Sequence, residues 1–207
     1  MIQQIEAAVL EAEPTWDVAK LFPDQGMWSE EEYLMLPDNR LTEFSHGRLE
    51  VLPMPSFAHQ LLVMLFYRLL HARIVSQNLG YAVVAPMRIQ LWRGKYREPD
   101  VALMLRAHRE RIHEQYWEGA DLVMEVVSPD DPLRDVETKR REYAQAGIPE
   151  YWLVNPASET ITVFTLPADA ASYDVHGVYT RGETAASLLL AGFTVDVEAC
   201  FAEAENF

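Results

Sequence analysis

An acidic residue, Glu125, interrupts the apolar segment DLVMEVVSP at residues 121–129. The apolar residues on either side predict a strand that is buried on both faces. A lone carboxylate in such a strand needs a partner, because burial disfavours its charged form. Glu125 is therefore the first candidate for a functional residue.

A second carboxylate, Asp100, begins another predicted strand, in REPDVALMLR at 97–106. The period of two places Glu125 on the same strand face as Val123 and Val127. The connection between the two strands is short enough for them to be neighbours. One divalent cation would then satisfy both acids, because Mg²⁺ is typically held by one or two carboxylates and several waters. Such a site leaves room for a phosphate oxygen and an attacking water.

A lysine follows within reach of these acids. The segment DDPLRDVETKRREYAQAG predicts a helix from about 132 to 146 that ends at Gly147. Asp135, Lys139 and Tyr143 fall at i, i+4 and i+8, so they share one stripe of this helix. The Lys139 ammonium could therefore reach back over the end of the sheet and stabilise charge that develops on a phosphate.

Capping signals and turn residues predict the elements that surround these segments. Ser29 and Glu32 form a capping box that opens a short helix. LTEFSHGRLEVLPM at 41–54 predicts a hairpin with its turn at His46 and Gly47. The hairpin and the short helix both precede the candidate acids in the chain.

Helical spacing of apolar residues then runs from 57 to 79, and Gly80 is expected to close this long helix. The charged residues 106–118 predict a loop or a short helix. Strands are predicted in YAVVAPMRIQLWRG, REPDVALMLR, DLVMEVVSP, EYWLVNP and SETITVFTL, with further short segments in the tail. This order predicts an α/β sandwich around a mixed sheet.

Bulk composition sets the class of protein. The chain has 207 residues, of which 49% are apolar, enough for one domain with its own core. The single cysteine, Cys200, excludes an internal disulfide, and no His or basic cluster beside it marks a nucleophile. The first residues carry no secretory signal, and the longest apolar run, at 61–70, is too short to span a bilayer. We therefore expect a cytoplasmic protein with no membrane contact.

The net charge of -15 is unfavourable for binding a phosphate backbone. The acidity is concentrated near the two ends, however, because residues 88–141 hold 11 of the 17 Lys and Arg residues. This distribution permits a basic surface in the middle of the chain. It is compatible with nucleic-acid binding without predicting it.

Several segments resemble the Uma2 (DUF820) family, which is classed with the endonucleases of the PD-(D/E)xK, restriction endonuclease-like superfamily. The resemblance covers roughly residues 28–200 and is carried by EPDVALM, DLVMEVVSP and RDVETKRREYAQAGIPEYWLVNP. TEFSHGRLEVLPMPSFAHQ resembles the family's N-terminal hairpin segment. The resemblance implies an α/β (α+β) fold with a restriction endonuclease-like mixed sheet flanked by helices. An acidic helical extension would occupy residues 1–27, and the domain itself residues 28–207.

The resemblance also implies roles for individual residues. Asp100 becomes the acid of the Pro-Asp motif, and Glu125 becomes the second metal ligand. The superfamily usually has a lysine two residues after this acid, where this chain has Val127, and Lys139 matches the lysine that has moved to the next helix. Glu43 matches a family acid that would complete the metal shell. The implied cofactor is Mg²⁺ or Mn²⁺, the implied substrate is DNA, and a homodimer is expected by analogy, since cutting both strands asks for two sites.

Each candidate also has a structural interpretation. Asp100 could cap the entrance of a strand, and Lys139 could be a surface residue of a solvated helix. Glu125 could form a structural ion pair with Arg88 or Arg97. His59 has a family counterpart, but a polar residue at the start of a long helix is a simpler interpretation of it than a ligand.

Two functions follow from these candidates. The first is a metal-dependent nuclease that hydrolyses phosphodiester bonds, with Asp100, Glu125 and Lys139 as the catalytic set. The second is a catalytically inactive restriction-like fold that binds DNA or another protein. A glycosidase with paired carboxylates is disfavoured, because no aromatic-lined sugar cleft is recognisable and the nearby lysine suits a phosphate.

Overall fold

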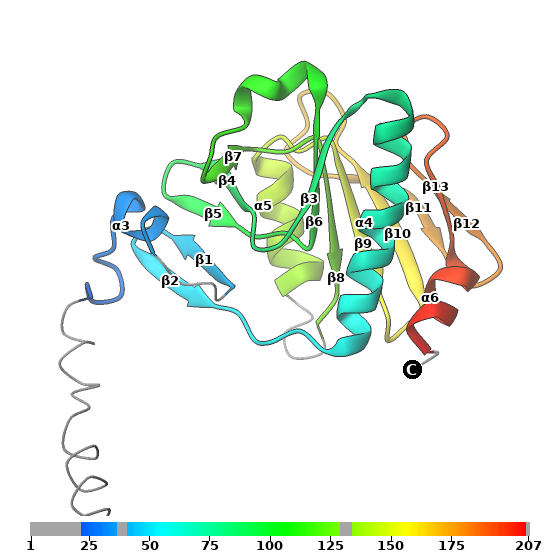
Figure 1. Ribbon diagram of the computed structural model, residues 1–207, viewed down its shortest axis with the longest axis horizontal. Helices are drawn as coiled ribbons and strands as arrows, with labels where there is room; N and C mark the ends of the chain where they lie inside the picture. The colour runs from blue at the N-terminus through cyan, green and yellow to red at the C-terminus, as the bar shows by residue number, and fades with distance from the viewer. Residues whose placement is uncertain (1–21, 37–40, 129–133, 206–207) are drawn as a thin grey trace, which may run out of the picture.

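The computed structural model describes residues 22–36, 41–128 and 134–205 (Figure 1). The predicted extension at 1–27 lies mostly outside these residues, so its boundary stays a prediction. No helix among the described residues is long and apolar enough to cross a membrane.

A six-stranded mixed sheet forms the centre of the molecule. The β8 and β9 strands are parallel, and every other neighbouring pair is antiparallel. In spatial order the strands are β11 (Asp174–Tyr179), β10 (Thr160–Thr165), β9 (Glu150–Asn155), β8 (Leu122–Val126), β6 (Val101–Leu105) and β3 (Gly80–Val84). Because helices cover this sheet on both sides, the predicted fold class is confirmed.

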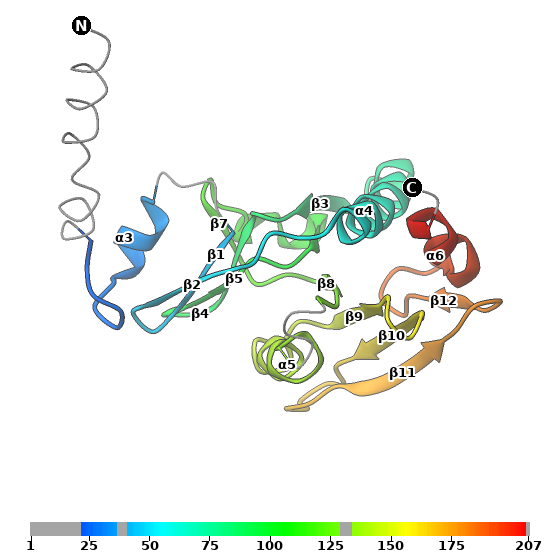
Figure 2. The same ribbon diagram turned by 90° about the horizontal axis from the view of Figure 1, so that it is seen from below.

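Helices α4 (Phe57–Gln77) and α6 (Val197–Glu205) lie on one face of this sheet, and α5 (Arg140–Gln145) lies on the other (Figure 2). The residues of β8 divide between the two faces. Leu122, Met124 and Val126 belong to the apolar cluster beneath α4 and α6. Val123 and Val127 belong to the cluster beneath α5. Alternation therefore directs Glu125 towards α5, on the face shared with Val123 and Val127 as predicted.

A second, five-stranded sheet stands beside the first. Its strands, in spatial order, are β2 (Arg48–Val51), β1 (Thr42–Ser45), β5 (Lys95–Arg97), β4 (Arg88–Trp92) and β7 (Tyr116–Glu118). The predicted hairpin is confirmed as β1 and β2, with positive φ angles at His46 and Gly47. It joins β5 and so becomes part of this sheet.

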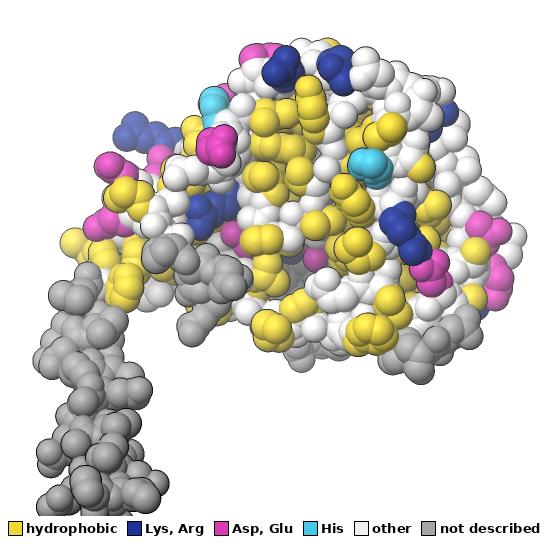
Figure 3. Space-filling view, in the orientation of Figure 1, with side chains coloured by type: hydrophobic (Ala, Val, Ile, Leu, Met, Phe, Trp, Pro, Cys, Tyr) yellow, Lys and Arg dark blue, Asp and Glu magenta, His cyan; other side chains and the backbone are white. Residues whose placement is uncertain are grey.

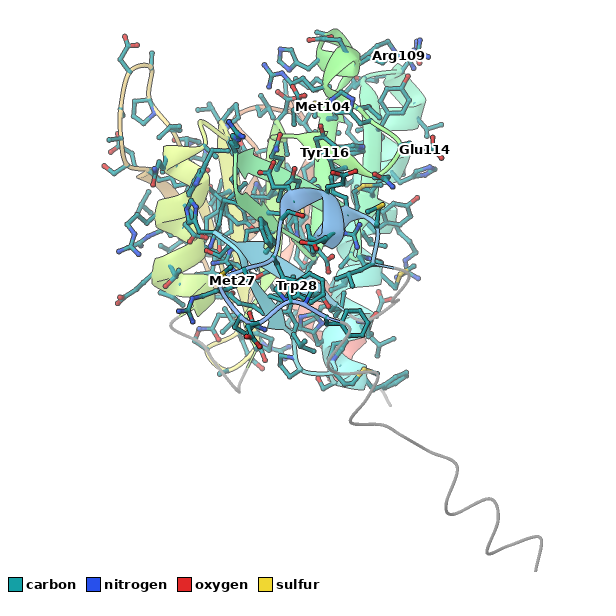
Figure 4. All side chains as sticks on the ribbon, turned by 90° about the vertical axis from the view of Figure 1, so that its left-hand side faces the viewer. Met27, Trp28, Met104, Arg109, Glu114 and Tyr116 are labelled. Atoms are coloured by element: carbon teal, nitrogen blue, oxygen red, sulfur yellow. The ribbon has the colours of Figure 1, made fainter. Side chains whose placement is uncertain are left out.

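The short helix α3 (Glu30–Leu34) begins with the predicted capping box, in which Ser29 and Glu32 bond reciprocally. It packs on the five-stranded sheet through an aromatic cluster that contains Trp28, Tyr33 and Phe44. Figure 4 shows α3 facing the viewer, with Trp28 below it and Tyr116 above it. This cluster holds β1, and therefore Glu43, against the rest of the domain.

Two boundaries differ from the sequence prediction. The long helix ends at Gln77 because Asn78 adopts a left-handed conformation with φ of 54°. Gly80 instead lies in β3, where a Cβ atom would sit 2.1 Å from the Met104 carbonyl oxygen. Only glycine fits at position 80, because β3 approaches the β6 backbone too closely for a side chain.

The remaining elements are short. Residues 106–118, predicted as a loop or helix, form a 3₁₀ segment (Arg106–Arg111) and the strand β7. The helix predicted from about 132 is described from residue 134 onwards, and it begins with a π-helical segment (Arg134–Lys139) that continues into α5. A two-stranded sheet, β12 (Thr184–Ala186) with β13 (Thr194–Asp196), precedes α6.

Candidate active site

The two predicted acids lie level with each other on neighbouring strands. The antiparallel register pairs Val101 of β6 with Met124 of β8, so Asp100, one residue earlier, lies opposite Glu125. The Val126 backbone N–H donates to Asp100 Oδ2 at 2.8 Å. This bond ties Asp100 to the residue that directly follows Glu125.

The buried Glu125 carboxylate is satisfied from the helix that follows it. Lys139 Nζ lies 2.9 Å from Glu125 Oε2, and Tyr143 Oη donates to Oε1 at 2.5 Å. Glu125 is 1% exposed, and Lys139 is also buried. Burial and the Glu125 charge both raise the pKa of Tyr143 well above its ordinary value, so Tyr143 remains a hydrogen-bond donor. The expected reach of Lys139 over the sheet is thus what the structure shows, while the Asp135 side chain lies outside the described residues.

Arg88 and Arg97, the alternative ion-pair partners of Glu125, contact other acids instead. Arg97 donates to Glu142 at 2.7 Å and to Glu43, and Glu43 also accepts the Glu98 backbone N–H at 3.2 Å. Arg88 Nε lies 3.8 Å from Glu98. Lys139 instead forms an ion pair with Glu125.

Asp100, Glu125 and Lys139 line one cavity of about 240 Å³ at the end of the six-stranded sheet. Glu43 is not among the described residues that line it, and its carboxylate serves the Arg97 ion pair. The structure therefore brings three of the four predicted site residues together. The fourth lies behind them, in the network that holds the five-stranded sheet.

A third carboxyl group of this cavity, Glu98, is absent from the sequence prediction. It is buried and accepts the Thr42 backbone N–H at 3.1 Å. Burial and the Glu43 charge raise the pKa of Glu98 to about 8, against the hydrogen bond from Thr42 and the positive charges of Arg88 and Lys139. This carboxyl group therefore holds its proton more readily than an ordinary glutamate does. Glu98 lies two residues before Asp100 in the sequence, and this proximity to a candidate acid was the signal that could have identified it.

His59, in the first turn of α4, completes the charged part of the cavity. Its Nε2 atom lies 3.2 Å from Asp100 Oδ2. Burial lowers the pKa of His59, but the hydrogen bond to Asp100 and the charges of Asp100 and Glu125 outweigh burial and raise it. Its Nδ1 atom is buried and has no hydrogen-bond partner in the described part of the chain. His59 is thus a contact of the candidate acid as well as a residue of the helix start.

The donor atoms of this cavity fit Mg²⁺ or Mn²⁺ held by two carboxylates. Asp100 uses Oδ2 for its two contacts, and Oδ1 makes no hydrogen bond with the described residues. Within those residues, no three His, Cys, Asp or Glu side chains are grouped so that they could hold a metal ion. Mg²⁺ needs only one or two carboxylates because it keeps several waters. Asp100 therefore fits such an ion, and Glu125 fits it once one of its oxygens exchanges its bond with Lys139 or Tyr143 for the metal, whereas a closed zinc site with four protein ligands does not fit the described residues.

Comparisons with known proteins agree with this fold. A solved structure from Anabaena variabilis ATCC 29413, described as a "putative nuclease belonging to DUF820", has a TM-score of 0.70 at 17% identity. The alignment covers 86% of this chain and 99% of that one, and at this identity it establishes the fold alone. No curated protein matched the sequence. The model of the Uma2 family, described as "Putative restriction endonuclease", matches residues 30–198. Because that match spans most of the chain, the protein belongs to the Uma2 family.

Proposed function

We propose that the protein is a metal-dependent nuclease that hydrolyses phosphodiester bonds of DNA. The observation that carries this proposal is the meeting of Asp100, Glu125 and Lys139 in one cavity, from two adjacent strands and the following helix. Two acids that can hold a metal, with a lysine beside them that can stabilise negative charge, suit phosphodiester hydrolysis. Membership of the Uma2 family supports the same reaction class.

Each residue has a defined task in this proposal. Asp100 and Glu125 would hold Mg²⁺ or Mn²⁺, which when bound polarises the phosphodiester and lowers the pKa of water. The Val126 N–H fixes the Asp100 carboxylate, and Tyr143 fixes that of Glu125. Lys139 places its ammonium beside Glu125, where it can orient the attacking water or stabilise charge that develops on the phosphate.

A second proposal is the binding module without catalysis. It is favoured by the state of Glu125, whose two oxygens both have partners in a fully buried setting. In that case the Lys139–Glu125 pair would be a structural ion pair, and the fold would bind DNA or protein without cutting it. A homodimer remains part of the nuclease proposal, because cleavage of both strands of a duplex asks for two sites.

The test is incubation of the full chain with supercoiled plasmid and with single-stranded DNA, in Mg²⁺ or Mn²⁺. We expect cleavage that EDTA stops and that Asp100→Asn and Glu125→Gln both lose. Cleavage that persists in EDTA would rule out the metal. No cleavage under any of these conditions, together with retained DNA binding, would favour the binding module.

A further inference from the structure

The cavity has an apolar wall that plays no part in the proposed hydrolysis of a phosphodiester. It is formed by the residue before β1, the segment after β2, the first two turns of α4 and the end of β3. Its main residues are Leu41, Leu52, Met54, Val63, Met64 and Val84. Water, a metal ion and a phosphate need no apolar surface of this kind.

Two methionines of this wall are open to solvent. Met54 is 91% exposed and Met64 is 44% exposed. Large exposed apolar side chains beside a polar site mark a surface that covers a ligand, and methionine adapts its shape to flat or irregular partners. Figure 3 shows hydrophobic side chains gathered on the face that carries α4, with only scattered Lys and Arg side chains among them.

Among the residues that the structure describes, four cations in or beside the cavity are directed at acids of the protein itself. Lys139 is the only Lys or Arg among the described lining residues, and it bonds Glu125. Arg88 faces Glu98, which lines the cavity, while Lys95 and Arg97 face Glu142 and Glu43, which do not line it. Duplex DNA is bound largely through many phosphate contacts with Lys and Arg. These walls therefore favour a substrate that gains affinity through an apolar surface.

We propose that this apolar wall seats one unpaired nucleobase while the phosphodiester next to it lies at Asp100 and Glu125. The inference rests on the proposed function and names its substrate class, which is single-stranded or locally unpaired nucleic acid. The volume of about 240 Å³ lies below the roughly 300–1,000 Å³ of pockets for drug-sized ligands, so it suits a single base. A base inside a duplex cannot enter such a cavity without leaving its stack. Contacts between aliphatic side chains and the flat face of a base discriminate little between bases, because every base has a flat face.

Binding can be measured without turnover by fluorescence anisotropy of the Asp100→Asn chain in EDTA. The probes are a labelled single strand of DNA, the same strand in a duplex, the same strand without its bases, and the matching RNA. We expect the single strand to bind about tenfold more tightly than the duplex or the abasic strand. Base-dependent binding of the RNA would also support the seat, and comparison with DNA would show which sugar the site accepts.

The wall itself is tested by adding Met64→Ala or Met54→Ala to the same chain. Each should weaken single-strand binding by about tenfold and leave duplex binding unchanged. Leu69→Ala is the matched control, since Leu69 is 36% exposed on the same helix but does not line the cavity. Met54 is so exposed that its replacement leaves the folded core intact, which keeps the test valid if Met64→Ala unfolds the chain.

The outcomes separate this inference from the proposed function. Equal binding of the base-containing and abasic strands, or equal effects of Met64→Ala and Leu69→Ala, would overturn the base seat. If the chain still cleaves duplex plasmid and this cleavage needs Asp100, the nuclease proposal would hold without the base seat. Base-dependent binding that needs Met64, without any cleavage by the wild-type chain, would support the seat and remove the nuclease.

Discussion

Lys139 and Glu125 form a buried ion pair with 2.9 Å between Nζ and Oε2, across a sequence separation of 14 residues. The acid belongs to β8, and the lysine ends the π-helical segment that leads into α5. At Val127, where the superfamily usually has its lysine, this chain has an apolar side chain packed beneath α5. A lysine from the helix therefore reaches the acid from the same face that a lysine at position 127 would have occupied.

Replacement of Lys139 by methionine is expected to reduce activity strongly and to lower stability. The change leaves the Glu125 carboxylate buried without its cation, which costs about 3–5 kcal/mol of unfolding free energy. Loss of the ammonium from the reaction site should reduce cleavage by roughly 10²–10³-fold. Urea unfolding and the rate of plasmid nicking measure the two effects separately.

Lys95→Met is the matched control for this variant. Lys95 is also buried, and its Nζ lies 2.9 Å from Glu142 Oε1, but it does not line the cavity. It should lose a similar amount of stability and keep most of its cleavage activity at a temperature where it is folded. Equal activity losses in the two variants would assign Lys139 a structural role only.

Tyr143→Phe is expected to act more mildly through the same acid. The variant removes the hydroxyl that donates to Glu125 Oε1, which should cost about 1–2 kcal/mol of stability. Because the carboxylate keeps its Lys139 contact, cleavage should fall by only about tenfold. Tyr173→Phe removes a comparable hydroxyl, bonded to the Ile148 carbonyl, and should leave the cleavage rate as it is.

The sequence predicted that the two acids and the lysine lie close together, because local rules govern their positions. The alternation of side chains along a strand predicted the sheet face on which Glu125 lies. The short connection between the two strands predicted that β6 and β8 are neighbours. Helical spacing placed Lys139 and Tyr143 on one stripe, which the structure directs at Glu125. These relationships involve segments that are close together in the chain, so a local sequence pattern is enough to predict them.

Relationships between distant segments could not be predicted in this way. The resemblance implies a place for Glu43 in the metal shell, which stays a prediction, but it did not predict the contact with Arg97 that the pairing of β1 with β5 creates. Glu98 joins the cavity because Thr42 from the same sheet holds its carboxyl group. The five-stranded sheet itself includes strands of three residues, whose partners are chosen by tertiary contacts rather than by propensity.

Metal binding should be visible as stabilisation of the folded chain. An ion that binds only the folded state at about 100 times its Kd raises the unfolding free energy by about 2.7 kcal/mol. Mn²⁺ should therefore raise the Tm of the wild-type chain but not that of Asp100→Asn. Glu50→Gln serves as the control, because Glu50 is a partly exposed acid that bonds Arg97 and lies outside the cavity lining. A shift of the same size in Asp100→Asn and the wild type would place the ion elsewhere.

The ion pairs of Glu142 should make stability depend on acidic pH. Burial raises the pKa of Glu142, but its bonds with Arg97 and Lys95 outweigh burial and bring the pKa below its ordinary value of 4.5. The contribution of Glu142 is therefore complete above about pH 4.5 and is lost as the pH falls through the lower pKa of the folded state. Glu142→Gln should be less stable than the wild type by about 1–3 kcal/mol near pH 7, and this gap should narrow as the pH falls below 4.5. Urea unfolding across this pH range measures the gap, and Glu137→Gln, at an exposed position just before α5, should show none. A gap that stays constant down to the lowest pH would mean that Glu142 stabilises the fold through packing and not through its charge.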